Sequence, residues 1–170
     1  MSLKPEVNQY DHVQGTVSAQ LEIVEFGDYQ CPYCGAAHPI VKEMMKEFGD
    51  QLKFVFRNFP LSELHQYARA AALMAEAAAT QGKFWQMHDA IFEQQQQLSE
   101  AFLLDLAKTQ EVNTLQLQDQ VERQKLAHKV DSDFESGMRS GVNATPTFFV
   151  NGVKFDGGAM DLLALLKNQS

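Results

Sequence analysis

The sequence is organised around one segment, Leu21-Glu22-Ile23-Val24-Glu25-Phe26-Gly27-Asp28-Tyr29-Gln30-Cys31-Pro32-Tyr33-Cys34-Gly35. Its first six residues are mostly apolar, which is typical of a buried strand, and a helical pattern of apolar residues begins near Cys31. The segment therefore predicts a strand, a short loop and a helix with Cys31 at its N-terminal end. Pro32 fits the first turn of that helix, because its missing N–H has no partner there in any case.

The position of Cys31 has chemical consequences. The first turn of a helix offers unpaired N–H groups and the positive end of the helix dipole, so it favours a thiolate over a thiol. Helix-terminal Cys-x-x-Cys thiols have pKa values lowered to roughly 3.5–7.5, and the thiolate is the attacking species in disulfide exchange. Cys34 follows one turn deeper. We therefore predict that Cys31 is an exposed nucleophile and that Cys34 is a buried resolving thiol.

The composition limits the remaining possibilities. A chain of 170 residues that is 45% apolar predicts one domain, or one domain with a sizeable insertion. The formal net charge is −8 and there is no basic run, which argues against nucleic acid as a partner. No apolar stretch approaches membrane-spanning length, so no membrane insertion is expected.

The two cysteines and the N-terminus bear on the compartment. Both cysteines lie in one motif, and closing a loop of about four residues constrains the unfolded chain little, so a bridge there would be chemistry more than scaffolding. Residues 1–7 show no apolar core and no cleavage-site pattern, so no signal peptide is predicted. The protein is cytoplasmic if Met1 is the native start, and periplasmic or exported if a signal peptide has been removed; both readings stay open.

Apolar periodicity predicts the elements of the first third of the chain. Residues 1–18 are polar, are interrupted by Pro5 and Gly15, and predict an extended lead-in. Residues 21–26 predict a central parallel strand, and Glu25 is its exception, because a carboxylate buried there must be hydrogen-bonded or functional. The helix from Cys31 is expected to reach Phe48 and to kink at Pro39, and residues 52–59 predict the second strand.

The rest of the chain is predicted to be five helices, a hairpin and a final helix. The pattern is helical throughout residues 62–140, where Asn113 and Gln116 resemble a capping box and Gln94–Gln97 indicates a solvated helix end. Asn151-Gly152 between two β-rich runs is a strong hairpin signal. Residues 160–167 predict the closing helix.

This order, β-α-β, helices, β-β-α, with Cys-x-x-Cys opening the first helix, resembles the thioredoxin fold. The helical insertion makes the chain similar to the DsbA-like branch of thiol-disulfide oxidoreductases. The resemblance implies an α/β protein of four parts: the lead-in 1–18, a β-α-β half 19–61, an all-helical subdomain 62–140 and a β-β-α half 141–170. It rests on four segments of the sequence: Phe26–Cys34, Pro39, Gly82–Asp89 and Gly141–Phe148.

The resemblance also implies roles for individual residues. Pro146 should be cis and lie against the two cysteines, and the backbone of Thr145 should then be free to pair with an extended substrate segment. Pro32 and Tyr33 are expected to complete the substrate-binding surface. Glu25 falls where the family keeps a buried acid beneath the resolving cysteine, and it would accept or relay the proton of Cys34.

The predicted function is thiol-disulfide exchange with protein cysteines or unfolded polypeptide. The redox pair Cys31 and Cys34 needs no bound cofactor, and glutathione or a redox partner protein would regenerate it. Tyr33 replaces the histidine of the best-known strong oxidants of this family and cannot offer a positive charge to the thiolate. We therefore expect a reduction potential below DsbA's value of about −120 mV.

Two other classes of function stay open. One is a glutathione-dependent transferase or isomerase of the same fold, although such enzymes generally do not need the second cysteine. The other is a metal-binding or polypeptide-binding module, with Cys31, Cys34 and His38 as three candidate zinc ligands where structural zinc requires four. His65 and His88 are interpreted as histidines at the edge of the core rather than as catalytic groups.

Overall fold

The computed structural model describes residues 1–169 and contains one five-stranded sheet in the order β1-β3-β2-β4-β5. The central strand β2 (Leu21–Gly27) pairs in parallel with β3 (Leu52–Asn58) and antiparallel with β4 (Thr147–Val150). The helix α1 (Pro32–Phe48) connects β2 to β3. The predicted α/β, thioredoxin-like fold is confirmed.

The predicted extended lead-in, residues 1–18, contains a strand that the sequence did not indicate. Residues His12–Gly15 form a further strand, β1, which pairs antiparallel with β3 at the edge of the sheet. The indole N–H of Trp85 donates to the carbonyl of Val13, and the His12 ring stacks on Phe84 at 3.8 Å. A short polar strand of this kind is stabilised by its partners, so its own sequence carries little signal.

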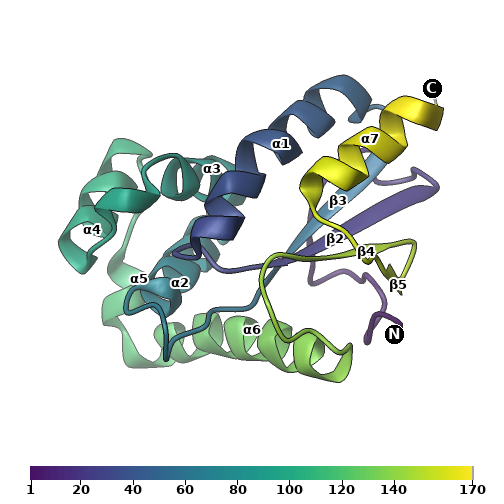
Figure 1. Ribbon diagram of the computed structural model, residues 1–170. Helices are drawn as coiled ribbons and strands as arrows, with labels where there is room; N and C mark the ends of the chain where they lie inside the picture. Colours follow the sequence, from purple (N-terminus) through teal and green to yellow (C-terminus); the bar gives the residue numbers. More distant parts are fainter. Residues whose placement is uncertain (170) are drawn as a thin grey trace.

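The sheet has a buried layer on each face because its side chains alternate. Ile23, Phe54 and Phe148 point into the larger core, which α1, α3 (Phe84–Glu93) and α7 (Ala159–Gln169) help to close. Val24, Val55 and Phe149 point into a smaller core on the opposite face, against which Phe134 of α6 packs. Figure 1 shows α1 and α7 side by side over one face and α6 along the other. Glu25 faces the α1 side and Arg57 faces the α6 side, since each follows this alternation.

The long helix α1 begins where the motif predicts. Cys31 is its N-cap residue, Pro32 occupies the first turn, and Gly49 is the C-cap. Pro39 lies inside the helix, which is continuous from Pro32 to Phe48. The predicted kink there stays a prediction.

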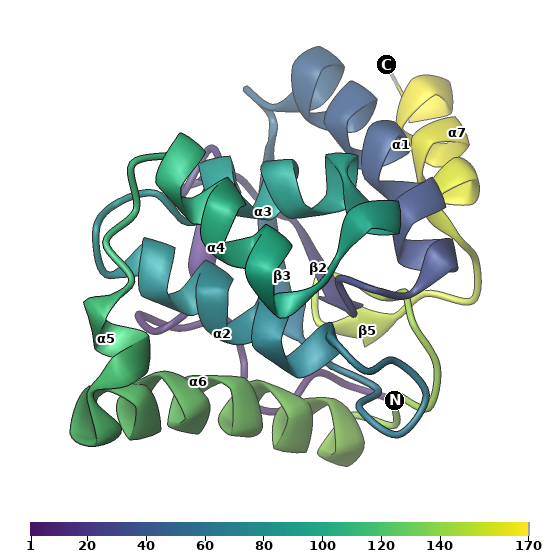
Figure 2. The same ribbon diagram turned by 90° about the vertical axis from the view of Figure 1, so that its left-hand side faces the viewer.

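The segment between β3 and β4 is helical, as predicted, but its divisions differ. It contains α2 (Ala68–Ala79), α3, the 3₁₀ turn η1 (Gln95–Gln97), α4 (Glu100–Thr109), α5 (Leu115–Gln118) and α6 (Gln120–Arg139), which Figure 2 shows in front of the sheet and beneath it. The predicted capping box was wrong: the Asn113 side chain accepts from the N–H of Leu115, two residues on. Asp119, which accepts from Glu122, instead caps α6, so Val121 belongs to that longer helix. The division of the chain into four parts stays a prediction.

The C-terminal elements follow the pattern of the sequence. Asn151 and Gly152 have φ values of +48° and +81° and connect β4 to β5 (Val153–Lys154) in a two-residue hairpin. Such a turn needs two residues that tolerate the left-handed region, which Asn-Gly supplies. Within residues 1–169, no helix combines the length and apolar character that a membrane crossing requires.

Candidate active site

Cys31 lies at the N-terminus of α1, but it is not the exposed residue that was predicted. It adopts an extended conformation as the N-cap residue, and its side chain is only 4% exposed. The sulfur packs under the loop before β4, where Sγ lies 3.6 Å from the carbonyl oxygen of Thr145. Cys34 is fully buried, so the predicted order of an outer and an inner sulfur is retained.

The surroundings of Cys31 stabilise its thiolate. A hydrogen bond from the Cys34 side chain is the largest contribution that lowers the pKa of Cys31, and the pKa falls to about 5 although burial opposes the change. Hydrogen bonds from the backbone of Cys34 and Tyr33 act in the same direction. These backbone groups belong to the first turn of α1, where N–H groups have no partner within the helix.

Cys34 has the opposite character. Both cysteines are free thiols, and the backbone N–H of Asp28 points at Cys34 Sγ at 3.4 Å. Burial raises the pKa of Cys34 far above its ordinary value, and the hydrogen bond to Cys31 and the charge of Glu25 add to this effect. Cys34 is therefore a protonated thiol that needs a base before it can attack.

Glu25 is an acid whose charge interacts with both cysteines. It is 3% exposed, and no hydrogen bond from residues 1–169 reaches its carboxyl group. Burial raises the pKa of Glu25 to about 8, and the negative charge of Cys31 adds to the increase. A carboxyl group with a pKa close to neutrality can both take up and release a proton under physiological conditions.

The loop before β4 presents a backbone to the two sulfurs. The Thr145–Pro146 peptide bond is cis, and Thr145 is buried beside Cys31. Within the described chain, neither the N–H nor the C=O of Thr145 forms a backbone–backbone hydrogen bond, and its hydroxyl oxygen has no partner. This loop therefore places a backbone N–H and a hydroxyl, both unpaired within residues 1–169, next to the reactive sulfur, while the Thr145 carbonyl faces Cys31 Sγ.

Pro32 and Tyr33 lie at the rim of the site. Both are exposed, and Tyr33 has 76% of its surface accessible to solvent. They follow Cys31 directly in the chain, in the first turn of α1.

Asp28 holds the loop between β2 and α1, a role that the sequence did not indicate. Its buried carboxylate accepts hydrogen bonds from the N–H of Gln30 and of Leu61, at 2.8 and 2.9 Å. His65 Nδ1 lies 2.7 Å from the same carboxylate. His65, a residue at the edge of the core, therefore supports the loop although it lies 37 residues further along the chain.

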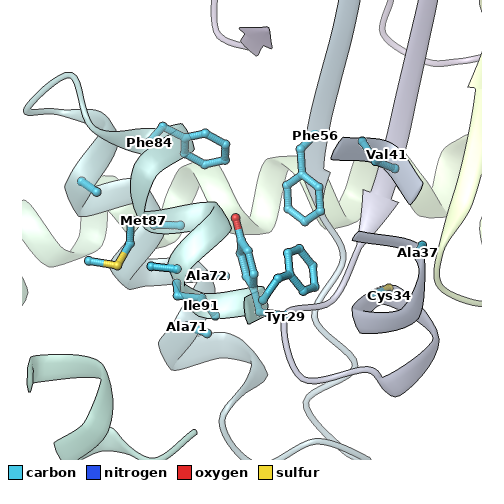
Figure 3. Packing of buried hydrophobic residues seen from close by; sticks show 14 of the residues in the cluster. Tyr29, Cys34, Ala37, Val41, Phe56, Ala71, Ala72, Phe84, Met87 and Ile91 are labelled. Carbon is cyan, nitrogen blue, oxygen red and sulfur yellow. The ribbon is translucent and has the colours of Figure 1, made fainter. Parts of the chain in front are cut away.

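Tyr29 and His88 connect the loop to the helices. The Tyr29 hydroxyl lies 2.9 Å from His88 Nδ1, and Figure 3 shows the Tyr29 ring between the helix that carries Met87 and the start of the helix that carries Cys34. Burial lowers the pKa of His88 well below its usual range, and positive charges nearby add to this, so the ring stays neutral.

The candidate metal ligands Cys31, Cys34 and His38 are not brought together as one set. Among residues 1–169, the one set of three potential ligand atoms within 4.8 Å of one another comes from His38, His88 and Asp89. Lys42 already holds Asp89 at 2.7 Å, and Tyr29 holds His88. Two of the three side chains, Asp89 and His88, are thus already paired with other side chains.

Comparisons with known proteins agree with this geometry. A family model described as Thioredoxin matches residues 7–167. The oxidised form of BdbD from Bacillus subtilis is similar in structure, with a TM-score of 0.82 and 27% identity over 99% of this chain and 96% of that one. A thioredoxin-like oxidoreductase from Silicibacter pomeroyi has a TM-score of 0.79 and 25% identity, and covers 95% of this chain and 93% of its own.

Curated relatives of this chain are larger proteins. The Na(+)/H(+) antiporter NhaA 1 of Salinispora arenicola is 40% identical over 147 residues, which are 86% of this chain and 22% of the antiporter. An NhaA 1 antiporter of Mycolicibacterium vanbaalenii is 39% identical over 91% of this chain and 25% of its own length. The chain spans about a quarter of the length of the curated relatives it matches.

Proposed function

The chain belongs to the DsbA-like thioredoxin family, and on this premise we propose that it exchanges disulfides with protein cysteines through Cys31 and Cys34. One observation carries the proposal: a sulfur with a pKa of about 5 lies at the N-terminus of α1, and a protonated second thiol lies directly behind it. A single reactive cysteine could form a mixed disulfide. The pair can also release it.

The first step is attack by the Cys31 thiolate on a substrate disulfide. A bond forms between Cys31 Sγ and one substrate sulfur, and the other substrate sulfur leaves as a thiolate. The low pKa of Cys31 keeps it ionised at neutral pH, so no base is needed for this step.

The second step requires Cys34 to lose its proton. Once Cys31 is in a mixed disulfide, its negative charge is gone, and that charge was one cause of the raised pKa of Glu25. The pKa of Glu25 therefore falls, and its ionised form can take the proton of Cys34. The Cys34 thiolate then attacks Cys31 Sγ, which forms the Cys31–Cys34 disulfide and releases the second substrate thiolate. Two electrons pass from the protein dithiol to the substrate, and the reverse sequence oxidises a substrate dithiol.

The substrate is proposed to bind as an extended segment beside Pro146. The N–H and C=O of Thr145 make no backbone–backbone hydrogen bonds within the described chain, so a polypeptide could add to them as a strand. Pro32 and Tyr33 would contact the side chains that flank the substrate cysteine. Because Cys31 is only 4% exposed, a substrate has to displace part of the loop around Thr145 to reach it.

No bound cofactor enters this scheme. The two sulfurs carry the electrons, and glutathione or a partner protein would restore their starting redox state. Glutathione transferase chemistry does not account for Cys34, whose thiol lies directly behind Cys31.

Reduction of insulin by dithiothreitol tests the proposal with the wild type, Cys31→Ser and Cys34→Ser. We expect turnover by the wild type, background rates with Cys31→Ser, and mixed disulfides that accumulate with Cys34→Ser and release on reduction. Equal turnover by Cys31→Ser and wild type would refute the proposal. Stoichiometric zinc or iron in the purified protein without turnover would instead favour a metal-binding module.

A further inference from the structure

One side chain of the helical segment reaches the redox motif from a run of four identical residues. Gln94, Gln96 and Gln97 are exposed, whereas Gln95 is partly buried at the start of η1. Its amide nitrogen donates to the carbonyl of Cys31 at 2.7 Å and to the carbonyl of Tyr29 at 2.9 Å. The run was predicted to be a solvated helix end, which is wrong for this one residue.

The two carbonyls that Gln95 holds lie on either side of the turn into α1. The carbonyl of Cys31 also accepts the N–H of Gly35 at 3.0 Å, which is a bond of the first turn of the helix. Both N–H groups of the Gln95 amide are therefore used, and they fix the backbone from which the Cys31 side chain projects.

We propose that Gln95 is a positioning residue of the redox centre: its side-chain amide orients the backbone of Cys31 towards the N–H groups at the start of α1. This inference rests on the proposed function and deepens it. The inference links the helical segment to the sulfur chemistry through two hydrogen bonds from one side chain. No other side chain of η1 within residues 1–169 bonds to the motif.

Gly35 provides independent support from the opposite side of the contact. A Cβ atom at Gly35 would overlap Gln95 Oε1, so any larger residue there would push the Gln95 amide away. Gly35 lies inside α1, where alanine would otherwise be the better helix former. The close approach of Gln95 therefore gives a physical reason for glycine at position 35.

Loss of the Gln95 amide has a predicted chemical direction. Without it, Cys31 is held less firmly against the N–H groups of Tyr33 and Cys34 that stabilise its thiolate. The thiolate and the reduced form become less favoured. We expect the pH of half-maximal alkylation to rise, because the ionisation constant of Cys31 falls about three- to tenfold. The equilibrium with glutathione should shift by a similar factor towards the disulfide.

The experiment measures the rate of iodoacetamide alkylation against pH, the equilibrium with glutathione, and the melting temperature for each variant. Gln95→Ala and Gln95→Glu remove the donor, and the second keeps the size of the side chain. Gln94→Ala, Gln96→Ala and Gln97→Ala are matched controls from the same run. A purely structural role would lower the melting temperature and leave the alkylation profile unchanged.

Gly35→Ala tests the contact without altering Gln95. It is expected to move the alkylation profile in the same direction as Gln95→Ala, and to have no further effect when added to Gln95→Ala. If Gln95→Ala fails to fold, Gln95→Glu and Gly35→Ala still report on the same contact.

The two proposals fail in different ways. A Gln95→Ala profile that matches the Gln96→Ala profile, or a Gly35→Ala effect that persists in full beside Gln95→Ala, overturns the role of Gln95 alone. A wild-type protein that fails to turn over insulin, yet shows an acidic alkylation profile that depends on Gln95, overturns the substrate class and supports the positioning role. A wild-type thiol with an ordinary profile overturns both.

Discussion

Two buried glutamates, Glu25 in β2 and Glu76 in α2, have opposite electrostatics. Glu25 and Glu76 are 3% and 4% exposed, respectively. Burial raises the pKa of Glu25 to about 8, whereas the pKa of Glu76 is lowered although burial acts against it. The difference lies in their partners. Glu76 accepts from Asn58 and lies 2.9 Å from His12 Nε2, whereas no residue of 1–169 donates a hydrogen bond to Glu25.

The same contrast holds for other buried groups of the molecule. Arg57, on the α6 side of the sheet, forms two hydrogen bonds with Asp11 and others with Ser136 and the carbonyls of Pro5 and Glu6. Charges paired in this way keep one protonation state and stabilise the fold. The unpaired carboxyl of Glu25 changes protonation state near neutral pH, while Cys31 is held as a thiolate and Cys34 as a thiol, which suits a redox centre. The comparison teaches that burial alone does not distinguish a structural acid from a functional one; its partners do.

The largest expected effect concerns Cys31, in the redox centre that contains the unpaired carboxyl of Glu25. Its alkylation rate should be half-maximal near pH 5, which is an ionisation constant about 10⁴-fold above that of a thiol with pKa 9.0. Mass spectrometry after limited reaction with iodoacetamide checks that Cys34 stays unmodified. A half-maximal rate near pH 8.5 would mean that this side of the molecule holds an ordinary thiol.

Among the paired charges, removal of Arg57 should have the largest effect. Arg57→Ala leaves the Asp11 carboxylate buried without its partner, and such changes cost about 3–5 kcal/mol of the free energy of unfolding. Denaturant unfolding measures this loss, and the alkylation profile of Cys31 should not move. The control is Arg69→Ala, whose exposed ion pair with Asp131 should be worth less than about 1 kcal/mol. Equal losses in the two variants would contradict the comparison.

Glu25→Gln and Glu76→Gln should change stability with opposite signs. The folded pKa of Glu25 lies above its ordinary value of 4.5, so the unfolded chain ionises first and wild-type stability falls as the pH rises from about 4.5 to 8. Glu25→Gln removes this loss, and at pH 8 it should be more stable than wild type by roughly 1–3 kcal/mol. Its resolution of mixed disulfides should nevertheless be slower, because the proton acceptor is absent.

Glu76→Gln should behave in the reverse way. The folded pKa of Glu76 lies below 4.5, so its stabilising effect is present at neutral pH and is lost as the pH falls through the folded value. The variant should be less stable than wild type by roughly 1–3 kcal/mol at pH 7, and the difference should narrow below about pH 4.5. Unfolding under reducing conditions at several pH values measures both variants. The same sign for both at pH 8 would remove the distinction between them.

The smallest expected effect is on the rim. Tyr33→His places a positive charge near the thiolate when protonated, so the equilibrium with glutathione should shift about tenfold towards the reduced protein, or about 30 mV upward in potential. The wild-type potential should lie below about −120 mV. Tyr33→Phe is the control, and neither change should alter stability much, because Tyr33 is 76% exposed. A wild-type potential at or above that value would show that the rim residue does not control it.

Much of the redox centre follows from local sequence signals. Cys-x-x-Cys at the start of an apolar helix places one sulfur outside the other, and Asn-Gly between β-rich runs places the hairpin that follows Thr145-Pro146. Glu25 interrupts an otherwise apolar strand, which marks it as a buried acid. Each of these signals works because it depends on the helix or strand period and on turn chemistry.

Other features depend on contacts between distant segments. Nothing in residues 12–15 marks a strand, since β1 forms through pairing with β3 and through Trp85. Nothing in four consecutive glutamines distinguishes Gln95, which bonds to carbonyls 64 and 66 residues away. The prediction that Cys31 is exposed failed for the same reason, because the loop that covers it lies 114 residues further on.

The sequence by itself determined the β-α-β and β-β-α halves, the redox pair and the acid near it, because these are written in residue types at short spacing. Only the tertiary structure decided which buried charges have partners. Hydrogen bonds and desolvation depend on distances of a few ångströms between groups far apart in the chain, and these distances set the pKa values on which the proposed chemistry depends.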